Sequence, residues 1–178
     1  MSKKVLIAYG TRYGAARIVA EDIAEYLGNR GLQVETVDLK KSRPSNKLIE
    51  YNLIVAGSSV AMISWVGAVK RFLRKCRQSG VPTAVYITCG TAINDIAKAR
   101  EKFLDKVLTR IKLDPVVSQP VCPVIDFRPG EGLPAKTKSR IKGTVKAMAK
   151  DDFREDGLMD LRDKARFGEF LEKLGEQV

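Results

Sequence analysis

Short, continuous apolar runs alternate along the chain with longer segments in which apolar residues recur every three or four positions. A run of four to eight apolar residues is typical of a strand buried on both faces, and the longer spacing is typical of an amphipathic helix. The predicted strands are 5–9, 34–38, 53–57, 84–88 and 116–125, the last interrupted by two prolines. The predicted helices are 15–29, 66–77, 95–112, 137–150 and 158–174, with a helical turn at 47–51.

This alternation predicts an α/β fold, a parallel sheet with helices on both faces. Right-handed crossovers then favour a doubly wound arrangement. We expect one domain over residues 1–178, with an extension at about 127–178. The extension comprises a Gly- and Pro-rich loop at 127–135, a basic helix and an acidic linker at 151–163. Ligands of such sheets bind beyond the carboxyl ends of the strands, so the loops after Tyr9, Gly57, Thr88 and Ile125 are the candidate site.

The first of these loops carries a phosphate-binding pattern. Unpaired amides at a helix N-terminus and the helix dipole favour an anion, Thr11 offers a hydroxyl, and Arg12 and Arg17 add charge. An ordinary strand–helix turn with glycines is the alternative. The Walker string and the G-x-G-x-x-G fingerprint are both absent. The predicted loop consists of Gly10, Thr11, Arg12, Tyr13, Gly14, Ala15, Ala16 and Arg17.

A nicotinamide cofactor is the competing interpretation of this loop. The spacing of Gly10 and Gly14 is similar to the glycine loop of short-chain dehydrogenases, and Asp38 ends the second strand, where a ribose would lie. The Tyr-x-x-x-Lys string of that family occurs nowhere in the chain. The sequence therefore favours another phosphate-bearing cofactor.

Composition narrows the chemistry further. The chain has no histidine, which excludes histidine-based triads, metal sites and general bases, and it favours a cofactor that brings its own reactivity. Three widely spaced cysteines form no zinc or disulfide pattern, and no signal-peptide layout is present, so we expect a cytoplasmic protein without a metal site. The net charge of +11 is concentrated in residues 61–150 and favours anionic partners, or serves solubility alone.

The segment Val5–Arg17 resembles the opening of flavodoxins, whose phosphate loop follows the pattern Thr/Ser-x-x-Gly-x-Thr. Thr11 and Gly14 match this pattern, and Ala16 stands where it has its last threonine. The resemblance implies a flavodoxin-like five-stranded sheet in the order 2-1-3-4-5 and FMN as the cofactor. Over roughly residues 4–112 the chain is most similar to the flavodoxin-type, quinone-dependent protoporphyrinogen dehydrogenases. The segments that carry this similarity are 9–14, 54–60, the helix through Phe72, and 84–86.

In flavodoxin-like proteins the isoalloxazine ring lies between two further loops, here 58–65 and 89–94. Met62 and Trp65 are the side chains able to cover a ring face, although Trp65 is equally explained as a core residue. Cys89 is a candidate redox thiol, but a small apolar filler is the commoner role for such a cysteine. The expected cofactor contacts in these loops are Ser58, Ser59, Val60, Met62, Trp65, Thr88, Cys89, Gly90 and Thr91.

Three functions remain open. The first is an FMN-dependent oxidoreductase that exchanges electrons with a quinone, a porphyrinogen or an acidic redox protein. The basic amphipathic stretch Lys136–Lys150 would suit peripheral membrane contact, or it is a solvated surface helix. The second is a soluble flavodoxin-type electron carrier, and the third is a flavin-free interaction module. We expect no nucleic acid as a partner, because no recognition motif or aromatic platform is present, and a homo-oligomer is left open.

Overall fold

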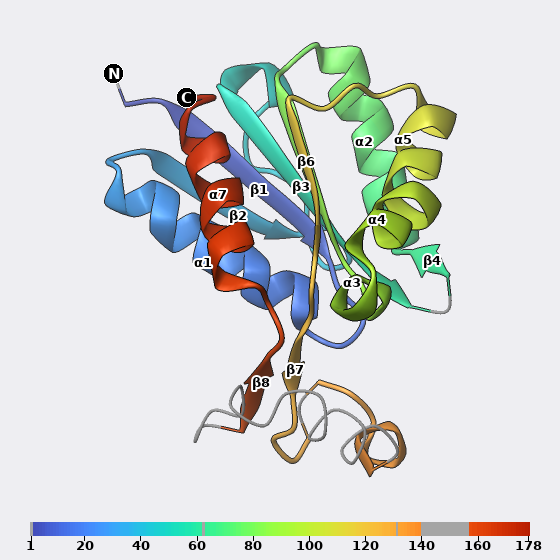
Figure 1. Ribbon diagram of the computed structural model, residues 1–178. Helices are drawn as coiled ribbons and strands as arrows, with labels where there is room; N and C mark the ends of the chain where they lie inside the picture. Colours follow the sequence, from blue (N-terminus) through green and yellow to red (C-terminus); the bar gives the residue numbers. More distant parts are fainter. Residues whose placement is uncertain (1, 62, 131, 140–156) are drawn as a thin grey trace.

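The computed structural model describes residues 2–61, 63–130, 132–139 and 157–178. Its centre is a parallel sheet in the order β2-β1-β3-β5-β6, which confirms the predicted α/β flavodoxin-like architecture (Figure 1). With the short β4 set aside, this is the expected order 2-1-3-4-5. The strands are β1 (Lys4–Gly10), β2 (Gln33–Asp38), β3 (Leu53–Ala61), β5 (Thr83–Thr88) and β6 (Val117–Val121), and β4 (Ser64–Trp65) pairs antiparallel with the end of β3.

Helices cover both faces of the sheet. Figure 1 shows α1 and α7 on one face and α2, α4 and α5 on the other. Along β1, Val5 and Ile7 pack against the first layer, whereas Leu6 and Ala8 pack against the second, which is why the strand is apolar throughout. The helical elements are α1 (Ala15–Asn29), η1 (Leu48–Glu50), α2 (Gly67–Ser79), α3 (Thr91–Asn94), α4 (Ile96–Ala99), the π-helical η2 (Arg100–Asp105), α5 (Lys106–Ile111) and α7 (Lys164–Gly175).

The predicted helix 95–112 is not one regular helix. The chain is already helical in α3, and Asp95 then adopts an extended conformation (φ −153°) that separates α3 from α4. The Asp95 carboxylate accepts a hydrogen bond from the Lys98 amide at 2.9 Å, so it caps a new helix start. The helical spacing of apolar residues therefore predicted helical structure in this segment, but it did not predict the interruption at Asp95.

The predicted helix 158–174 is wrong at its start. Leu158–Asp160 forms strand β8, which pairs antiparallel with β7 (Val124–Asp126). The helix begins at Lys164, where the Asp163 carboxylate accepts a hydrogen bond from the Arg166 amide. The predicted strand 116–125 is interrupted as expected, because it splits into β6 and β7 at Cys122 and Pro123.

The C-terminal segment returns to the fold. In α7, Phe170 and Leu174 are buried in the core cluster that α1 and the sheet share, and Arg162 forms an ion pair with Asp22 of α1. Residues 164–175 therefore pack as a helix on the same face of the sheet as α1. Residues 140–150 of the predicted basic helix and 151–156 of the predicted linker lie outside the described residues. Among the described residues no helix is both long and apolar enough to span a membrane.

Candidate functional site

The loop between β1 and α1 presents free amides. Gly14 has φ +91°, a left-handed conformation that glycine adopts without strain, and it turns the chain into α1. The Thr11 hydroxyl accepts a hydrogen bond from the Gly14 amide at 2.9 Å, which fixes this turn from within. In the described part of the chain, no protein group accepts from the amides of Ala15, Ala16 and Arg17. These three amides form a preformed anion site.

The two arginines of the loop do not supply the predicted charge. The Arg12 guanidinium is directed at the β3–β4 hairpin, where it donates to the carbonyl oxygens of Ala61 at 2.6 Å and Ser64 at 3.0 Å. Arg17 forms an ion pair with Glu21 at 2.6 Å on the same helix. The cation that sequence reasoning missed is Lys40, whose ammonium group donates to the Thr11 carbonyl at 3.2 Å.

A hydrogen bond from Tyr86 in the core holds the first turn of α1. This side chain is fully buried, and its hydroxyl donates to the Ala16 carbonyl at 2.6 Å. The Tyr86 ring crosses β3 at Gly57, where a β-carbon would lie 1.9 Å from the ring. Burial raises the pKa of Tyr86 well above its ordinary value of 10.0, so its hydroxyl stays a donor. Gly57 therefore lets a tyrosine of β5 reach through to the phosphate loop.

A cavity of about 200 Å³ opens beside this loop at the carboxyl ends of β3 and β5. The Thr88 hydroxyl is buried here, and within the described structure it has no hydrogen-bond partner. An unpartnered buried hydroxyl is costly, so a polar group of a ligand at this position would stabilise the protein. The residues lining the cavity are Tyr13, Ala15, Ser59, Val60, Ala61, Thr88, Cys89, Gly90, Pro123, Val124, Ile125, Asp126 and Leu133.

Seven residues predicted from the sequence line this cavity together. They come from the segments after Tyr9, Gly57 and Ile87 and are Tyr13, Ala15, Ser59, Val60, Thr88, Cys89 and Gly90. Cys89 is 4% exposed, and burial raises the pKa of its thiol, so it has the properties of a small core residue. Thr91 begins α3 without lining the cavity, and Met62 lies outside the described residues.

Two predicted contacts are instead part of the framework. The loop 58–65 is a hairpin, because β3 continues to Ala61 and pairs with β4. Ser58 is fully buried, and its hydroxyl accepts a hydrogen bond from the Val66 amide at 3.0 Å. Trp65 is 2% exposed, and its indole nitrogen donates to the Phe103 carbonyl at 2.6 Å. Core packing therefore holds Trp65 away from any ring in the cavity.

Sequence reasoning missed one wall of the cavity. Pro123 to Asp126 and Leu133 close it from the side, and only the position of a loop after Ile125 signalled them. Gly132 (φ +60°) packs so closely on Asp126 that a β-carbon there would lie 2.8 Å from the aspartate backbone. Hydrogen bonds from Arg128 lower the pKa of Asp126, whose side chain is 3% exposed. This wall is thus fixed by its own ion pair.

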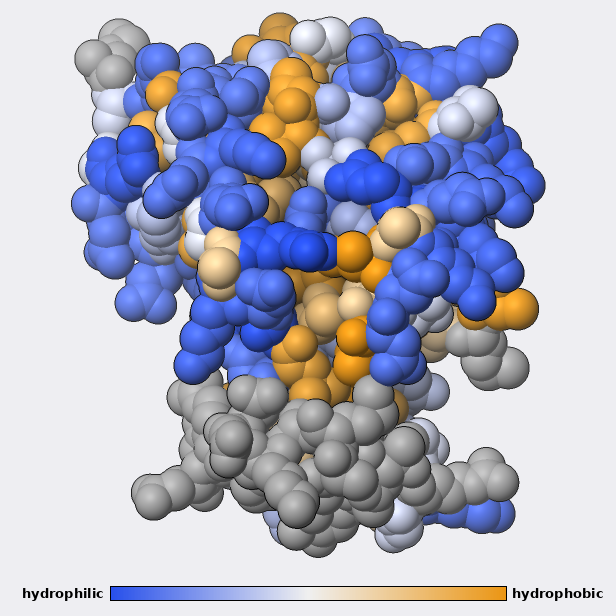
Figure 2. All heavy atoms as spheres, viewed as in Figure 1, coloured by the Kyte–Doolittle hydropathy of each residue, from blue (hydrophilic) through white to orange (hydrophobic). Residues whose placement is uncertain are grey.

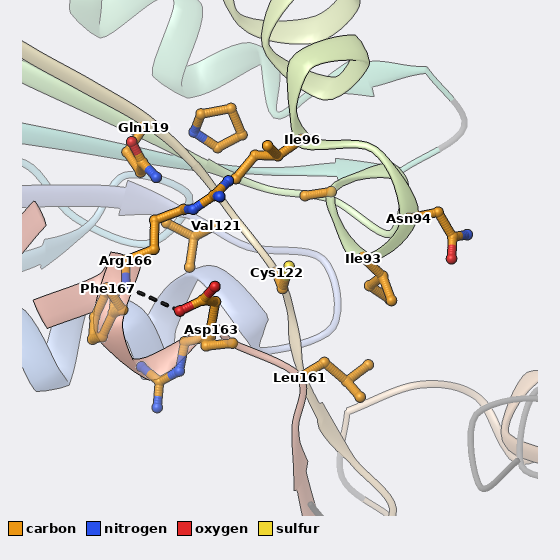
Figure 3. Close-up of a pocket in the computed structure, with 13 residues that line it drawn as sticks. Ile93, Asn94, Ile96, Gln119, Val121, Cys122, Leu161, Asp163, Arg166 and Phe167 are labelled. Atoms are coloured by element: carbon orange, nitrogen blue, oxygen red, sulfur yellow. Dashed lines mark hydrogen bonds between the residues drawn. The ribbon is translucent and has the colours of Figure 1, made fainter. Parts of the chain in front are cut away.

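A larger cavity of about 420 Å³ lies at the edge of the sheet and contains none of the predicted cofactor contacts. Figure 3 shows the Arg166 side chain extending from α7 across β6, with Cys122, Ile96 and Phe167 around it. Figure 2 shows apolar side chains in the groove along β6, between α7 and the helices of the opposite layer. The unpartnered hydroxyl and free amides are at the smaller cavity, which we therefore take as the candidate site.

Known proteins resemble this chain in family and in fold. A family model for a flavodoxin domain matches residues 6–117, and no curated protein sequence matches the chain. The structure is similar to a short-chain flavodoxin associated with a non-canonical PDU bacterial microcompartment, with a TM-score of 0.56, 13% identity, and coverage of 98% of this chain and 97% of that one. It is also similar to the flavodoxin of Streptococcus pneumoniae TIGR4, with a TM-score of 0.54, 15% identity, and coverage of 98% and 99%.

Two further structures extend this comparison. Oxidised flavodoxin 1 from Bacillus cereus has a TM-score of 0.51 and 16% identity, with coverage of 84% of this chain and 99% of that one. For the rubredoxin:oxygen oxidoreductase of Desulfovibrio gigas the TM-score is 0.48 at 16% identity; the alignment covers 83% of this chain, which spans only 34% of that protein. The likeness to the three flavodoxins, whose TM-scores exceed 0.5, establishes the fold alone at these identities.

Proposed function

This chain belongs to the flavodoxin domain family, and from that premise we propose that it binds FMN in the cavity beside the phosphate loop and acts as an FMN-dependent oxidoreductase. The observation that carries the proposal is the buried hydroxyl of Thr88, a residue that lines this cavity; the hydroxyl has no partner among the described residues. The family relationship explains why a cavity at this place would hold a flavin.

The residues present fit the parts of FMN. The free amides of Ala15, Ala16 and Arg17 would hold its phosphate, since the first turn of a helix binds phosphate without a side-chain ligand. The Thr88 hydroxyl and the backbone of Gly90 would face polar atoms of the ring. The threonine that Ala16 replaces is therefore dispensable in this loop, because Thr11 and Tyr86 already fix the turn.

The size of the cavity limits how much of the ring it encloses. Its volume of about 200 Å³ is below the range of about 300–1,000 Å³ that is usual for ligand pockets. One edge of the ring would therefore stay exposed outside the cavity. Bound FMN would supply the redox chemistry, and an exposed edge is where electrons would pass to a partner.

For the partners, we propose a reduced organic substrate as electron donor and a quinone or protein acceptor. A porphyrinogen is our candidate donor, because its carboxylates suit the net charge of +11 and because segments 9–14 and 54–60 resemble the porphyrinogen dehydrogenase group. A basic electron carrier with an acidic protein partner is the second candidate, and the same charge favours it.

Isothermal titration of the flavin-free protein with FMN tests the site. We expect Thr88→Val to weaken FMN binding about tenfold while leaving the stability of the flavin-free protein unchanged or higher, because it removes an unpaired buried hydroxyl. Thr83→Val is the matched control on the same strand: its hydroxyl donates to the Val81 carbonyl at 2.8 Å, far from the cavity. That variant should lose stability and keep its FMN affinity.

Two results would contradict the proposal. Wild-type protein that takes up no FMN would exclude the cofactor, and equal affinities for wild type and Thr88→Val would remove Thr88 from the site. The partner is tested separately, by mixing the FMN-loaded protein anaerobically with protoporphyrinogen and following the flavin absorbance. Absorbance that does not bleach would exclude that donor and leave the electron carrier as the remaining candidate.

A further inference from the structure

A second concave site lies between the connection that follows β2 and the helix α2. This pocket, here called the basic pocket, has a volume of about 390 Å³. Its lining combines four cationic side chains with an apolar floor and includes no carboxylate. The lining residues are Leu39, Ser42, Arg43, Pro44, Asn46, Lys47, Leu48, Ala68, Arg71, Phe72 and Lys75.

The four cations, Arg43, Lys47, Arg71 and Lys75, come from two separate elements. Arg43 and Lys47 lie in the connection before η1, and Lys47 is its N-cap residue. Arg71 and Lys75 lie one turn apart on α2. All four are exposed, and among the described residues none of them forms an ion pair. Four like charges around one concavity whose lining contains no carboxylate create a positive local potential.

Folding alone does not explain this arrangement. Helix α2 carries five basic residues and no acidic one. Arg71 and Lys75 are an i,i+4 pair of like charge, which destabilises a helix, and the basic residues in its first half oppose the helix dipole. Acidic residues at some of these positions would stabilise α2. The charges are therefore better explained by an anion that binds here.

The apolar residues at the floor of the basic pocket indicate that the anion also has an apolar part. Phe72 is 7% exposed and belongs to the core cluster, and Leu39, Leu48 and Ala68 pack against the same cluster. A rigid apolar floor suits a flat ring, since pockets for small molecules pair apolar walls with a few polar groups that fix orientation. The volume of about 390 Å³ is within the usual range for such ligands.

The basic pocket and the candidate FMN site are neighbours. Leu39 contributes to the floor of the pocket, and the next residue, Lys40, reaches the Thr11 carbonyl of the phosphate loop. The basic pocket begins directly after the carboxyl end of β2, and the candidate FMN cavity lies at the carboxyl ends of β3 and β5, on the same edge of the parallel sheet. No residue lines both cavities.

We propose that the basic pocket binds a nucleoside diphosphate, with its base on the Phe72 floor and its phosphates among Arg43, Lys47, Arg71 and Lys75. The proposal does not depend on FMN. A flat heterocycle with two adjacent phosphates matches an apolar floor ringed by cations better than a polymeric anion does, because a polymer would need an extended groove.

The test is isothermal titration of the full chain with ADP. We expect saturable binding with one ADP per chain, and at least tenfold weaker binding in the variant Arg71→Gln/Lys75→Gln. The matched control is Lys70→Gln/Arg74→Gln, which removes the same charge from the same helix at positions that do not line the pocket. The ADP affinity of this control should be within about twofold of that of the wild type, because salt screens the effect of charges outside the pocket.

Three outcomes would overturn the proposal. These are the absence of saturable ADP binding, equal weakening in both double variants, and affinity for inorganic pyrophosphate equal to that for ADP. The last would mean an anion patch without a base site. FMN titrations of the same variants keep the two sites separate: Arg71→Gln/Lys75→Gln should bind FMN normally, and Thr88→Val should bind ADP normally. Because glutamine favours helices, circular dichroism should show all these variants folded.

Discussion

Replacing Tyr86 by phenylalanine isolates one hydrogen bond between the core and the phosphate loop. The ring stays in place over Gly57, and only the bond from the hydroxyl to the Ala16 carbonyl at 2.6 Å is lost. Because this carbonyl lies inside α1, it keeps its place in the helical ladder. We therefore expect a loss of about 1 kcal/mol in the free energy of unfolding, the usual net value for a buried hydrogen bond. For a chain of this size that corresponds to a melting temperature lower by about 2–4 °C.

The pH dependence makes this prediction specific. Burial raises the pKa of Tyr86 well above 10.0, so in the folded protein the hydroxyl stays protonated while in the unfolded chain it ionises near pH 10. The stabilisation that the Tyr86 hydroxyl provides is therefore fully present below about pH 10 and is lost as the pH rises further. The reason is that ionisation of Tyr86 stabilises the unfolded chain, and only the wild type has this phenol. At about pH 11 this linkage amounts to about 1.4 kcal/mol, enough to cancel the gap between wild type and Tyr86→Phe.

The assay is urea unfolding of both proteins at several pH values between neutrality and about pH 11. Tyr51→Phe is the matched control, because the Tyr51 hydroxyl also donates a hydrogen bond, to Glu35, at a distance from the loop. Only Tyr86→Phe should also weaken FMN binding, by loosening the first turn of α1. A stability gap that stays constant up to about pH 11 would refute the reasoning, since it would mean that the phenol ionises equally easily in both states.

Two further predictions concern packing and acid stability. Gly57→Ala should destabilise the protein by about 3 kcal/mol or more, because the new β-carbon would lie 1.9 Å from the Tyr86 ring. In a double-mutant cycle, Tyr86→Leu should recover part of this loss of stability. Additive effects of the two substitutions would contradict the clash. Asp126→Asn should lower stability at neutral pH, with the gap closing below about pH 4, because the lowered pKa of Asp126 stabilises the fold only while the carboxylate is charged. Urea midpoints from pH 7 to pH 3 measure this, and a gap that is as large at pH 3 as at pH 7 would exclude the ion pair as its cause.

The sheet was predictable from the sequence because its strands are buried on both faces. In β1 each residue from Val5 to Ala8 has an apolar neighbour above or below, so the run is continuous and its type is unambiguous. The strand Leu158–Asp160 gave no such signal. It exists because β7 offers it a partner, and pairing between segments more than 30 residues apart leaves no local pattern.

The candidate site was predictable in its backbone and less so in its side chains. Gly14 and the start of α1 were identified because a tight turn and free amides follow from local sequence. Trp65 and Ser58 are turned into the core by the hairpin β3–β4, and this orientation, which depends on the pairing of Val60 with Trp65, could not be predicted from local sequence. Sequence near a loop thus fixes amide positions better than it fixes side-chain directions.

The arginines show the same limit, and they lead to a prediction. A charge beside a phosphate loop strengthens binding only if it is not already neutralised, and the Arg17 guanidinium is paired with Glu21 at 2.6 Å, whereas Lys40 makes its contact with the neutral Thr11 carbonyl. We therefore expect Lys40→Gln to weaken FMN binding about fivefold at low salt, with the difference fading near 1 M salt as screening increases. The double variant Arg17→Gln/Glu21→Gln should change the affinity less than twofold, because the Arg17–Glu21 pair that it removes carries no net charge. FMN titrations at low and high salt decide between the two residues. A larger loss for Arg17→Gln/Glu21→Gln than for Lys40→Gln would show that the ion pair opens when phosphate binds and that the Arg17 guanidinium then contacts the phosphate.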